Sequence, residues 1–137
     1  MENNSKHITY LVNHEETFRR IIINRNYKTR KCHIDFFLAG YMHYYAKDLI
    51  EFLTKNEPIN LVHETFNPYD KFAIAIYDRD WVKLGYVPKI ISPLISYKLE
   101  NEKNNIYGVI KEINLHEINE CKIEIRVYMN MIKYNKS

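Results

Sequence analysis

The feature of this sequence that most constrains its fold is a run of strand-forming residues from Leu61 to Val87, interrupted by two short polar turns. The first turn is Asn67–Asp70, which reads NPYD, and the second is Asp78–Asp80. Residues 72–77 and 81–87 flank the second turn and are rich in apolar and aromatic side chains, so they predict the two strands of a hairpin. An antiparallel pair of strands is therefore expected in this region.

Other segments show either helical or alternating patterns. Residues 14–23 predict a short helix, because Asn13 and Glu16 resemble a capping box and apolar residues then recur on one helical face. Two further helices are expected, at residues 46–55 and after Pro88. Five or six short strands with two or three helices are typical of a small β-barrel or sandwich with helical additions. The other strands are expected at residues 33–39, 59–63, 106–114 and 122–129.

The length and composition indicate one domain. A chain of 137 residues can form one core but is too short for two ordinary domains. We expect residues 33–130 to form this domain, residues 1–32 to be a basic N-terminal extension and residues 131–137 to be a C-terminal tail. No apolar run approaches the roughly 20 residues of a membrane span, and Met1–Asn4 is polar with no signal peptide after it. A cytoplasmic protein without a membrane partner is the expectation.

Basic residues are concentrated near the N-terminus. The net charge is only +3, but the segment from Arg19 to Lys31 contains six basic residues and no acidic one. Such a segment favours binding to nucleic acid, although a solvated charged face has the same composition. The six residues are Arg19, Arg20, Arg25, Lys28, Arg30 and Lys31.

The sequence lacks recognisable motifs for enzymatic chemistry. Its three glycines are isolated, so no phosphate-binding loop is present, and its cysteines and histidines lack the spacing of metal ligands. The nearest catalytic pattern is Glu120 and Lys122 together with Asp70, which loosely resembles the carboxylates and lysine of some magnesium-dependent nucleases. Metal-assisted hydrolysis needs a clustered set of carboxylates, which the sequence does not supply. We expect no enzyme, no cofactor and no bound metal.

Turn chemistry explains only part of the NPYD segment. Asn67 before a proline starts a turn, Pro68 fixes one backbone dihedral, and Asp70 can accept hydrogen bonds from nearby amides. Tyr69 is not needed for any of this. Its ring either folds back as a lid on the core or is offered for stacking.

Five short segments follow one another in a characteristic order and spacing: Leu38–Gly40 with Tyr44–Tyr45, Leu61–Glu64, Asn67–Asp70, Ala73–Tyr77 and Leu84–Pro88. In this order and spacing the chain resembles the HIRAN domain family. The resemblance extends from about His33 to Asn130, and the combination of NPYD with the later GYVP is specific. It implies a mostly β fold with helices (α+β): a small OB-like β-barrel of five to six strands with two to three helices. It also implies binding of single-stranded DNA, with capture of a free 3′-hydroxyl end.

The resemblance also implies roles for individual residues. Tyr69 and Tyr44 match two aromatic residues that stack on terminal bases, and Asp70 matches the carboxylate that accepts the hydrogen bond of the 3′-hydroxyl. Because one extra residue lies between Gly40 and the tyrosine pair, Tyr45 is the alternative to Tyr44. Aromatic stacking tolerates any base, and a carboxylate accepts from a hydroxyl but repels a phosphate.

Three further residues are candidates for contacts with the phosphates of a strand. Lys71 and Lys89 flank the two signature loops and would position the strand without reading its sequence. His43 stands where the end-binding relatives have an arginine, and a neutral imidazole is a weaker phosphate ligand.

The expected function is therefore that of a nucleic-acid-binding module in DNA repair or replication. Single-stranded DNA is the expected ligand, the sequence does not distinguish it from RNA, and a separate helicase or nuclease is a candidate partner. The alternative is a protein-interaction adaptor on the same fold, in which the tyrosines are core or interface anchors.

Overall fold

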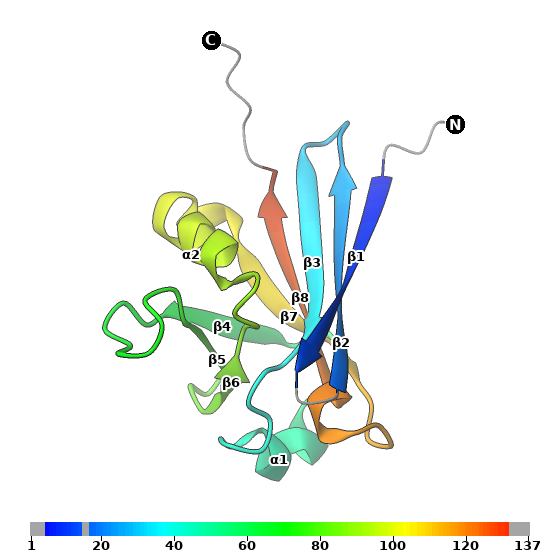
Figure 1. Cartoon of the computed structure of the whole chain (residues 1–137), viewed down its shortest axis with the longest axis vertical. Coiled ribbons are helices and arrows are strands. Elements are labelled where there is room, and N and C mark those ends of the chain that lie inside the picture. Colours follow the sequence, from blue (N-terminus) through cyan, green and yellow to red (C-terminus); the bar gives the residue numbers. More distant parts are fainter. Residues whose placement is uncertain (1–4, 15–16, 132–137) are drawn as a thin grey trace.

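The computed structural model describes residues 5–14 and 17–131, in which the main feature is one sheet of eight strands (Figure 1). The strand order is β1-β2-β3-β8-β7-β4-β5-β6, and every neighbouring pair is antiparallel. The strands are β1 Ser5–His14, β2 Thr17–Asn26, β3 Lys31–Phe37, β4 Pro58–His63, β5 Ile74–Tyr77, β6 Lys83–Tyr86, β7 Tyr107–Ile113 and β8 Ile123–Asn130.

The sheet is an open ladder with β1 and β6 at its ends. Isolated backbone hydrogen bonds bring β6 back toward the segment that follows β3: Ala39 N donates to Tyr86 O at 2.9 Å, Tyr86 N donates to Ala39 O at 2.8 Å, and Tyr45 N donates to Lys83 O at 3.2 Å. The prediction of a mostly β fold with helices is thus confirmed. The prediction of a small OB-like β-barrel of five to six strands is wrong in two respects, because the sheet has more strands and does not close into a barrel.

The predicted helix at residues 14–23 is also wrong. Thr17–Asn26 forms strand β2, and residues 15–16 lie outside the described residues. The strand pairs Ile21 with Phe36 and Ile23 with Ile34 of β3, which buries both isoleucines. β-Branched side chains suit such a half-covered strand, and this pairing outweighs the local helical spacing. The extension predicted at residues 1–32 therefore contributes β1 and β2 to the sheet.

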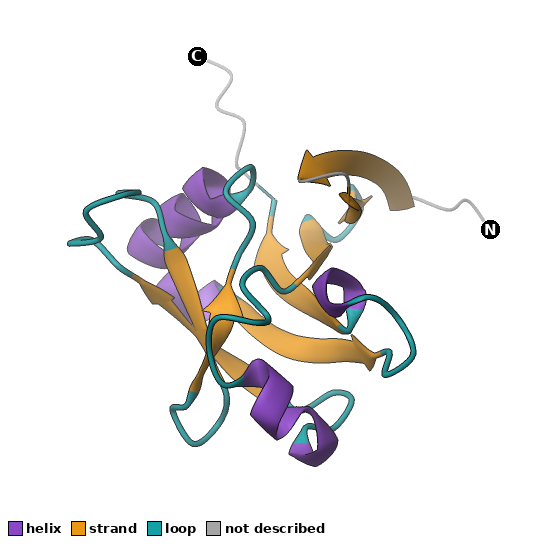
Figure 2. Ribbon diagram, turned by 60° about the horizontal axis from the view of Figure 1, so that its bottom comes forward, coloured by secondary structure: helices purple, strands orange, loops and turns teal. Residues whose placement is uncertain are grey.

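The helical segments lie at the periphery of the strands (Figure 2). The helix predicted at residues 46–55 is the short α1, Ala46–Leu49, followed by the 3₁₀ turn η1, Ile50–Phe52. The helix predicted after Pro88 is α2, Ser92–Asn101. Two more 3₁₀ turns are η2, Lys103–Asn105, and η3, Asn119–Cys121. Within the described part of the chain, no helix has both the length and the apolar character needed to span a membrane.

The hydrophobic core is one cluster of buried side chains from strands β2 to β8, the two α-helices and the segments between them. Strand β8 shows the principle, because the side chains that alternate along it from Ile123 to Met129 are buried. Burial of such aliphatic side chains is the main favourable contribution to folding. The largest fully buried apolar side chains are Phe36, Ile21, Ile34, Leu38, Ile74, Ile76, Leu84, Ile95, Ile110, Ile123 and Ile125.

Gly85 allows β6 to approach the segment after β3. A methyl group at this position would collide with the carbonyl oxygen of Ala39 and would lie 2.9 Å from Leu38 Cγ. The obstacle is backbone, which cannot move away without breaking the bridge between Ala39 and Tyr86. The glycine of the GYVP segment is therefore required by a close approach of two chain segments.

We predict that Gly85→Ala lowers the free energy of unfolding by about 1–3 kcal/mol, because overpacking against a fixed backbone cannot be relieved. Gly108→Ala is the matched control, since its added methyl group would meet Ile59 Cδ1 at 2.6 Å, and the end of a side chain can rotate away. Urea denaturation of the two variants and the wild type measures both effects. Equal destabilisation by the two substitutions would contradict this explanation of Gly85.

Candidate functional site

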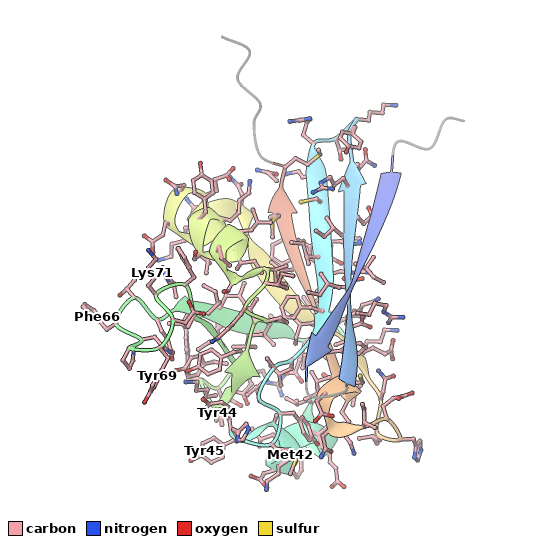
Figure 3. The ribbon with its side chains drawn as sticks, viewed as in Figure 1. Met42, Tyr44, Tyr45, Phe66, Tyr69 and Lys71 are labelled. Carbon is pink, nitrogen blue, oxygen red and sulfur yellow. The ribbon has the colours of Figure 1, made fainter. Side chains whose placement is uncertain are left out.

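The NPYD segment is a tight turn held by its own side chains. Asn67 Oδ1 accepts hydrogen bonds from the backbone amides of Tyr69 at 2.9 Å and Asp70 at 3.0 Å. Asp70 Oδ1 in turn accepts from the amide of Phe72 at 2.9 Å. These bonds fix the backbone while the side chain of Tyr69 remains 91% exposed. The turn therefore projects Tyr69 outward, as Figure 3 shows, and the ring is not a lid on the core.

A cleft of about 760 Å³ lies beside this turn. Its walls come from the start of β2, the loop after β3, the NPYD turn, the segment after β6, and η3. The cleft therefore combines segments that are far apart in the sequence. Its lining residues include Arg20, Phe37, Gly40, Met42, His43, Tyr44, Asn67, Tyr69, Asp70, Tyr86, Lys89, Ile90 and Glu120.

The structure brings most of the predicted site residues together. Those that line the cleft are His43, Tyr44, Tyr69, Asp70 and Lys89.

Two predicted residues do not line the cleft. Tyr45 is 59% exposed and points away from the fold, so that Tyr44 is the member of the tyrosine pair at the cleft (Figure 3). Lys71 follows the turn, and its Nζ atom lies 5.0 Å from the ring centroid of Phe72. The sequence spacing left Tyr44 and Tyr45 as alternatives, and the fold of the loop separates them.

The ring of Tyr44 is half-buried and held from one side. It packs edge-on against Tyr86, with ring centroids 5.5 Å apart. Lys83 Nζ lies 4.7 Å from the Tyr44 centroid and 4.3 Å from the Tyr86 centroid, so one ammonium group contacts both rings. The ring of Tyr44 is therefore held by Tyr86 and Lys83, whereas the ring of Tyr69 is exposed to solvent.

Glu64, at the end of β4, links this pair of rings to the rest of the site. Its carboxylate accepts a hydrogen bond from the Tyr86 hydroxyl at 2.7 Å and forms an ion pair with Lys83 Nζ at 3.0 Å. Lys83 Nζ also lies 2.5 Å from the Tyr86 hydroxyl. Asn67 Nδ2 donates to the same carboxylate at 3.0 Å, and Asn67 N donates to Glu64 O at 3.0 Å. One carboxylate thus fixes both the Tyr44 side and the NPYD side of the cleft.

The pKa shifts in this network keep Glu64 and Lys83 charged at neutral pH. Burial tends to raise the pKa of Glu64, but hydrogen bonds from Tyr86, Asn67 and Lys83 outweigh burial and lower it. Burial tends to lower the pKa of Lys83, but its bonds to Tyr86 and Glu64 raise it to about 12. Burial and the bond to Glu64 raise the pKa of Tyr86 to about 12 against the effect of Lys83. At neutral pH the network is a carboxylate, an ammonium and a neutral phenol.

Sequence reasoning missed several residues of the site. Three of them, Tyr86, Lys83 and Glu64, lie within or beside the segments that resemble the HIRAN family. The family motif was therefore the signal that could have indicated them. Arg20 lines the cleft from β2, but the sequence pattern shows it only as one of several basic residues. Met42 and Ile90 add apolar surface to the cleft and have no local signature.

The nuclease pattern does not assemble as a unit. Asp70 and Glu120 line the same cleft, but Lys122 does not, and its Nζ atom donates to Leu115 O at 3.2 Å. Among residues 5–14 and 17–131, no three or more His, Cys, Asp or Glu side chains are grouped so that they could hold a metal ion.

The fold and the cleft define a small β-rich domain with an aromatic and charged binding site, and comparison with known proteins identifies its family. The chain belongs to the HIRAN domain family, which it matches over residues 31–131. The predicted resemblance is thereby confirmed. The chain is 33% identical over 58 residues to the helicase-like transcription factor of Oryctolagus cuniculus, a match that covers 42% of the chain and 6% of that protein. The chain thus spans only a small part of that relative.

Two solved structures share the fold. The crystal structure of the HIRAN domain of human HLTF has a TM-score of 0.56 and 20% identity, covering 72% of this chain and 76% of that one. The crystal structure of a protein from Lactobacillus plantarum has a TM-score of 0.57 and 12% identity, covering 91% of this chain and 96% of that one. Residues 31–137 alone cannot supply 91% of the chain, so the second match reaches into the first thirty residues.

We predict that Glu64 makes the stability of the domain depend on pH in the acidic range. Its pKa in the folded chain lies below the ordinary value of 4.5, so its contribution is complete above that value and is lost as the pH falls through the folded-state pKa. The difference in unfolding free energy between the wild type and Glu64→Gln should therefore be constant near neutral pH and shrink in acid. Urea denaturation from about pH 7 to about pH 3 measures it.

Glu117→Gln is the matched control, because Glu117 is an exposed carboxylate outside the network. A difference between wild type and Glu64→Gln that stays the same at every pH would contradict the role assigned to the Glu64 charge.

Proposed function

We propose that this HIRAN domain binds single-stranded DNA at a free 3′-hydroxyl end. The observation that carries the proposal is that Tyr44, Tyr69 and Asp70 line one cleft, together with the cations Arg20 and Lys89. Two aromatic rings, a hydrogen-bond acceptor and basic side chains are the components that recognition of a strand end requires.

The rings of Tyr44 and Tyr69 would contact the bases of the strand in different ways. Tyr44 is held against Tyr86 and Lys83, so it offers a preorganised surface for one face of a base. Tyr69 is almost fully exposed at the tip of a rigid turn, so it can cover a base from another side with little loss of backbone entropy. Base stacking on such rings is worth about 1–3 kcal/mol per base and is independent of sequence.

Asp70 provides the preference for an unmodified end. Its Oδ1 atom is used by the amide of Phe72, and Oδ2 accepts no hydrogen bond from the described residues. A carboxylate oxygen at this position can accept from a 3′-hydroxyl, whereas a 3′-phosphate would bring negative charge against it. The chemistry of Asp70 therefore favours a free hydroxyl over a blocked end.

The remaining cleft residues position the strand without reading its sequence. Lys89 is exposed and would contact a phosphate. His43 also lines the cleft and offers a weaker phosphate contact than an arginine. Lys71 lies beside the turn and outside the cleft, so we propose for it only a long-range attraction.

A module that holds 3′ ends serves enzymes that act on such ends. We therefore propose a helicase or nuclease on a separate chain as the class of partner, in DNA repair or replication. RNA also has bases that can stack and a terminal 3′-hydroxyl, so the titration below includes an RNA strand of the corresponding sequence, with uracil in place of thymine.

We predict that the wild type binds a strand with a 3′-hydroxyl about tenfold or more tightly than one with a 3′-phosphate, because of charge repulsion at Asp70. Asp70→Asn should reduce this ratio toward one, since an amide oxygen can still accept from the Phe72 amide but carries no charge. Tyr69→Ala should weaken binding to both strands by about 1–3 kcal/mol. Fluorescence titration of labelled oligonucleotides measures all three.

Tyr97→Ala is a suitable control, because Tyr97 is an exposed tyrosine on α2, away from the cleft. Equal affinity of the wild type for the two ends, or an unchanged ratio in Asp70→Asn, would contradict end recognition.

We also propose that the cleft binds nucleic acid without cleaving it, because Lys122 is turned to Leu115 and only Asp70 and Glu120 of the nuclease pattern reach the cleft. The prediction is that a labelled single strand stays intact during prolonged incubation with excess protein and Mg²⁺ or Mn²⁺. Denaturing gel electrophoresis measures this. Metal-dependent degradation that disappears in Asp70→Asn would contradict it.

One observation favours the adaptor alternative. Phe66, which precedes the NPYD turn, is 97% exposed and points away from the body of the domain, as an anchor for a protein partner would (Figure 3). An adaptor would show no affinity for oligonucleotides at low salt, where nucleic-acid binding is strongest. The titration therefore separates the two functions.

A further inference from the structure

Arg20 reaches the cleft from outside the segment that defines the family. It lies on β2, whereas the family match begins at residue 31. Pairing of β2 with β3 places the Arg20 guanidinium 5.7 Å from the ring centroid of Phe37 at the end of β3. Both Arg20 and Phe37 line the cleft. The β1–β2 hairpin thus adds a cation to a site otherwise built from the HIRAN segment.

Arg20 is the outermost member of a network of charged side chains on the sheet. Its Nη2 atom lies 3.3 Å from Glu124 Oε2, and Lys111 Nζ lies 3.4 Å from Glu124 Oε1. Lys111 Nζ also lies 3.0 Å from Asp35 Oδ2, and Arg126 binds Asp35 through two hydrogen bonds of 2.7 and 2.9 Å. The network joins β2, β3, β7 and β8.

This network contains one more cation than carboxylates. Asp35 and Glu124 are buried, at 2% and 3% exposure, and they are shared among the three cations Arg20, Lys111 and Arg126. Burial tends to raise the pKa of Asp35, but the bonds from Arg126 and Lys111 outweigh it and lower that pKa, so the carboxylate is charged at neutral pH. The network therefore carries one uncompensated positive charge.

The excess charge is most accessible at Arg20. Its side chain is 47% exposed, against 27% for Lys111 and 26% for Arg126. Glu124 uses one nitrogen of the guanidinium, which leaves other N–H groups of its planar fork for a second acceptor. Glu120 of η3 is an acidic residue on the same wall and opposes this charge in part.

We propose that Arg20 binds a backbone phosphate of the strand whose 3′ end lies at Asp70. This inference rests on the proposed function and adds to it a phosphate ligand from β2. Figure 1 shows β2 and the loop after β4 as separate parts of the fold, and Arg20 of β2 and Asp70 of that loop both line the cleft. A phosphate bound at Arg20 would lie next to a cation of β2 rather than next to the Asp70 carboxylate, which would repel it.

The test compares Arg20→Gln with the wild type by titration of a 3′-hydroxyl single strand at several salt concentrations. Arg20→Gln should weaken binding about tenfold at low salt, since a charge-assisted hydrogen bond is lost. It should also reduce the slope of log K against log salt by about 0.7, the value for one phosphate contact on a single strand. Glu120→Gln should strengthen binding, and Arg20→Lys should retain part of the affinity.

Lys28→Gln is the matched control for net charge. Lys28 is an exposed cation in the turn at the other end of β2, so its loss changes the overall charge equally without touching the cleft. If Arg20→Gln and Lys28→Gln have the same affinity and the same salt slope, the inference is wrong while the proposed function stands. If the wild type binds no single strand at any salt concentration, both are wrong.

A second variant distinguishes the loss of a phosphate contact from a loss of stability caused by removing Arg20. Arg20→Gln leaves the buried Glu124 with Lys111 alone, so its stability is measured by urea denaturation, and Arg20→Gln with Glu124→Gln removes the unbalanced carboxylate. If the double variant is as stable as the wild type but still binds the strand weakly, the result supports the phosphate contact. Recovery of wild-type affinity by the double variant would overturn it.

Discussion

The site depends on the carboxylate of Glu64. This group is three-quarters shielded from solvent and is surrounded by an ammonium, a phenol and an amide that all donate to it. The donors come from two segments that are far apart in the fold's connectivity: Lys83 and Tyr86 are on β6, and Asn67 begins the NPYD turn. Because a buried charge must keep its partners, these segments are held at fixed positions relative to one another.

This constraint explains how two tyrosines from separate loops are positioned at one cleft. Tyr44 packs on the Tyr86–Lys83 pair, while the backbone that carries Tyr69 is bound to Asn67. Only the Tyr44 ring is held by side chains outside its own loop, whereas the Tyr69 ring is exposed on a fixed backbone. In the proposed complex, a strand that enters the cleft would find the Asp70 acceptor and the Tyr44 surface already in place.

The sequence predicted local features well and long-range features poorly. The turn at Asn67–Asp70 follows from the dihedral preferences of its residues, which do not depend on the rest of the chain. The three consecutive isoleucines at 21–23 suit either a helix or a strand, and the choice was made by pairing with β3, which sequence periodicity does not contain. For the same reason the sequence indicates the basic segment from Arg19 to Lys31 but does not distinguish Arg20 as a residue of the cleft. The choice between Tyr44 and Tyr45 depended on the path of an irregular loop.

The most direct test of this account is a crystal structure of the domain with a short single strand that ends in a 3′-hydroxyl. The account predicts the terminal base in contact with the rings of Tyr44 and Tyr69, and the 3′ oxygen within hydrogen-bonding distance of the Asp70 carboxylate. A strand bound on another surface, or bound in the cleft with its 5′ end at Asp70, would contradict it.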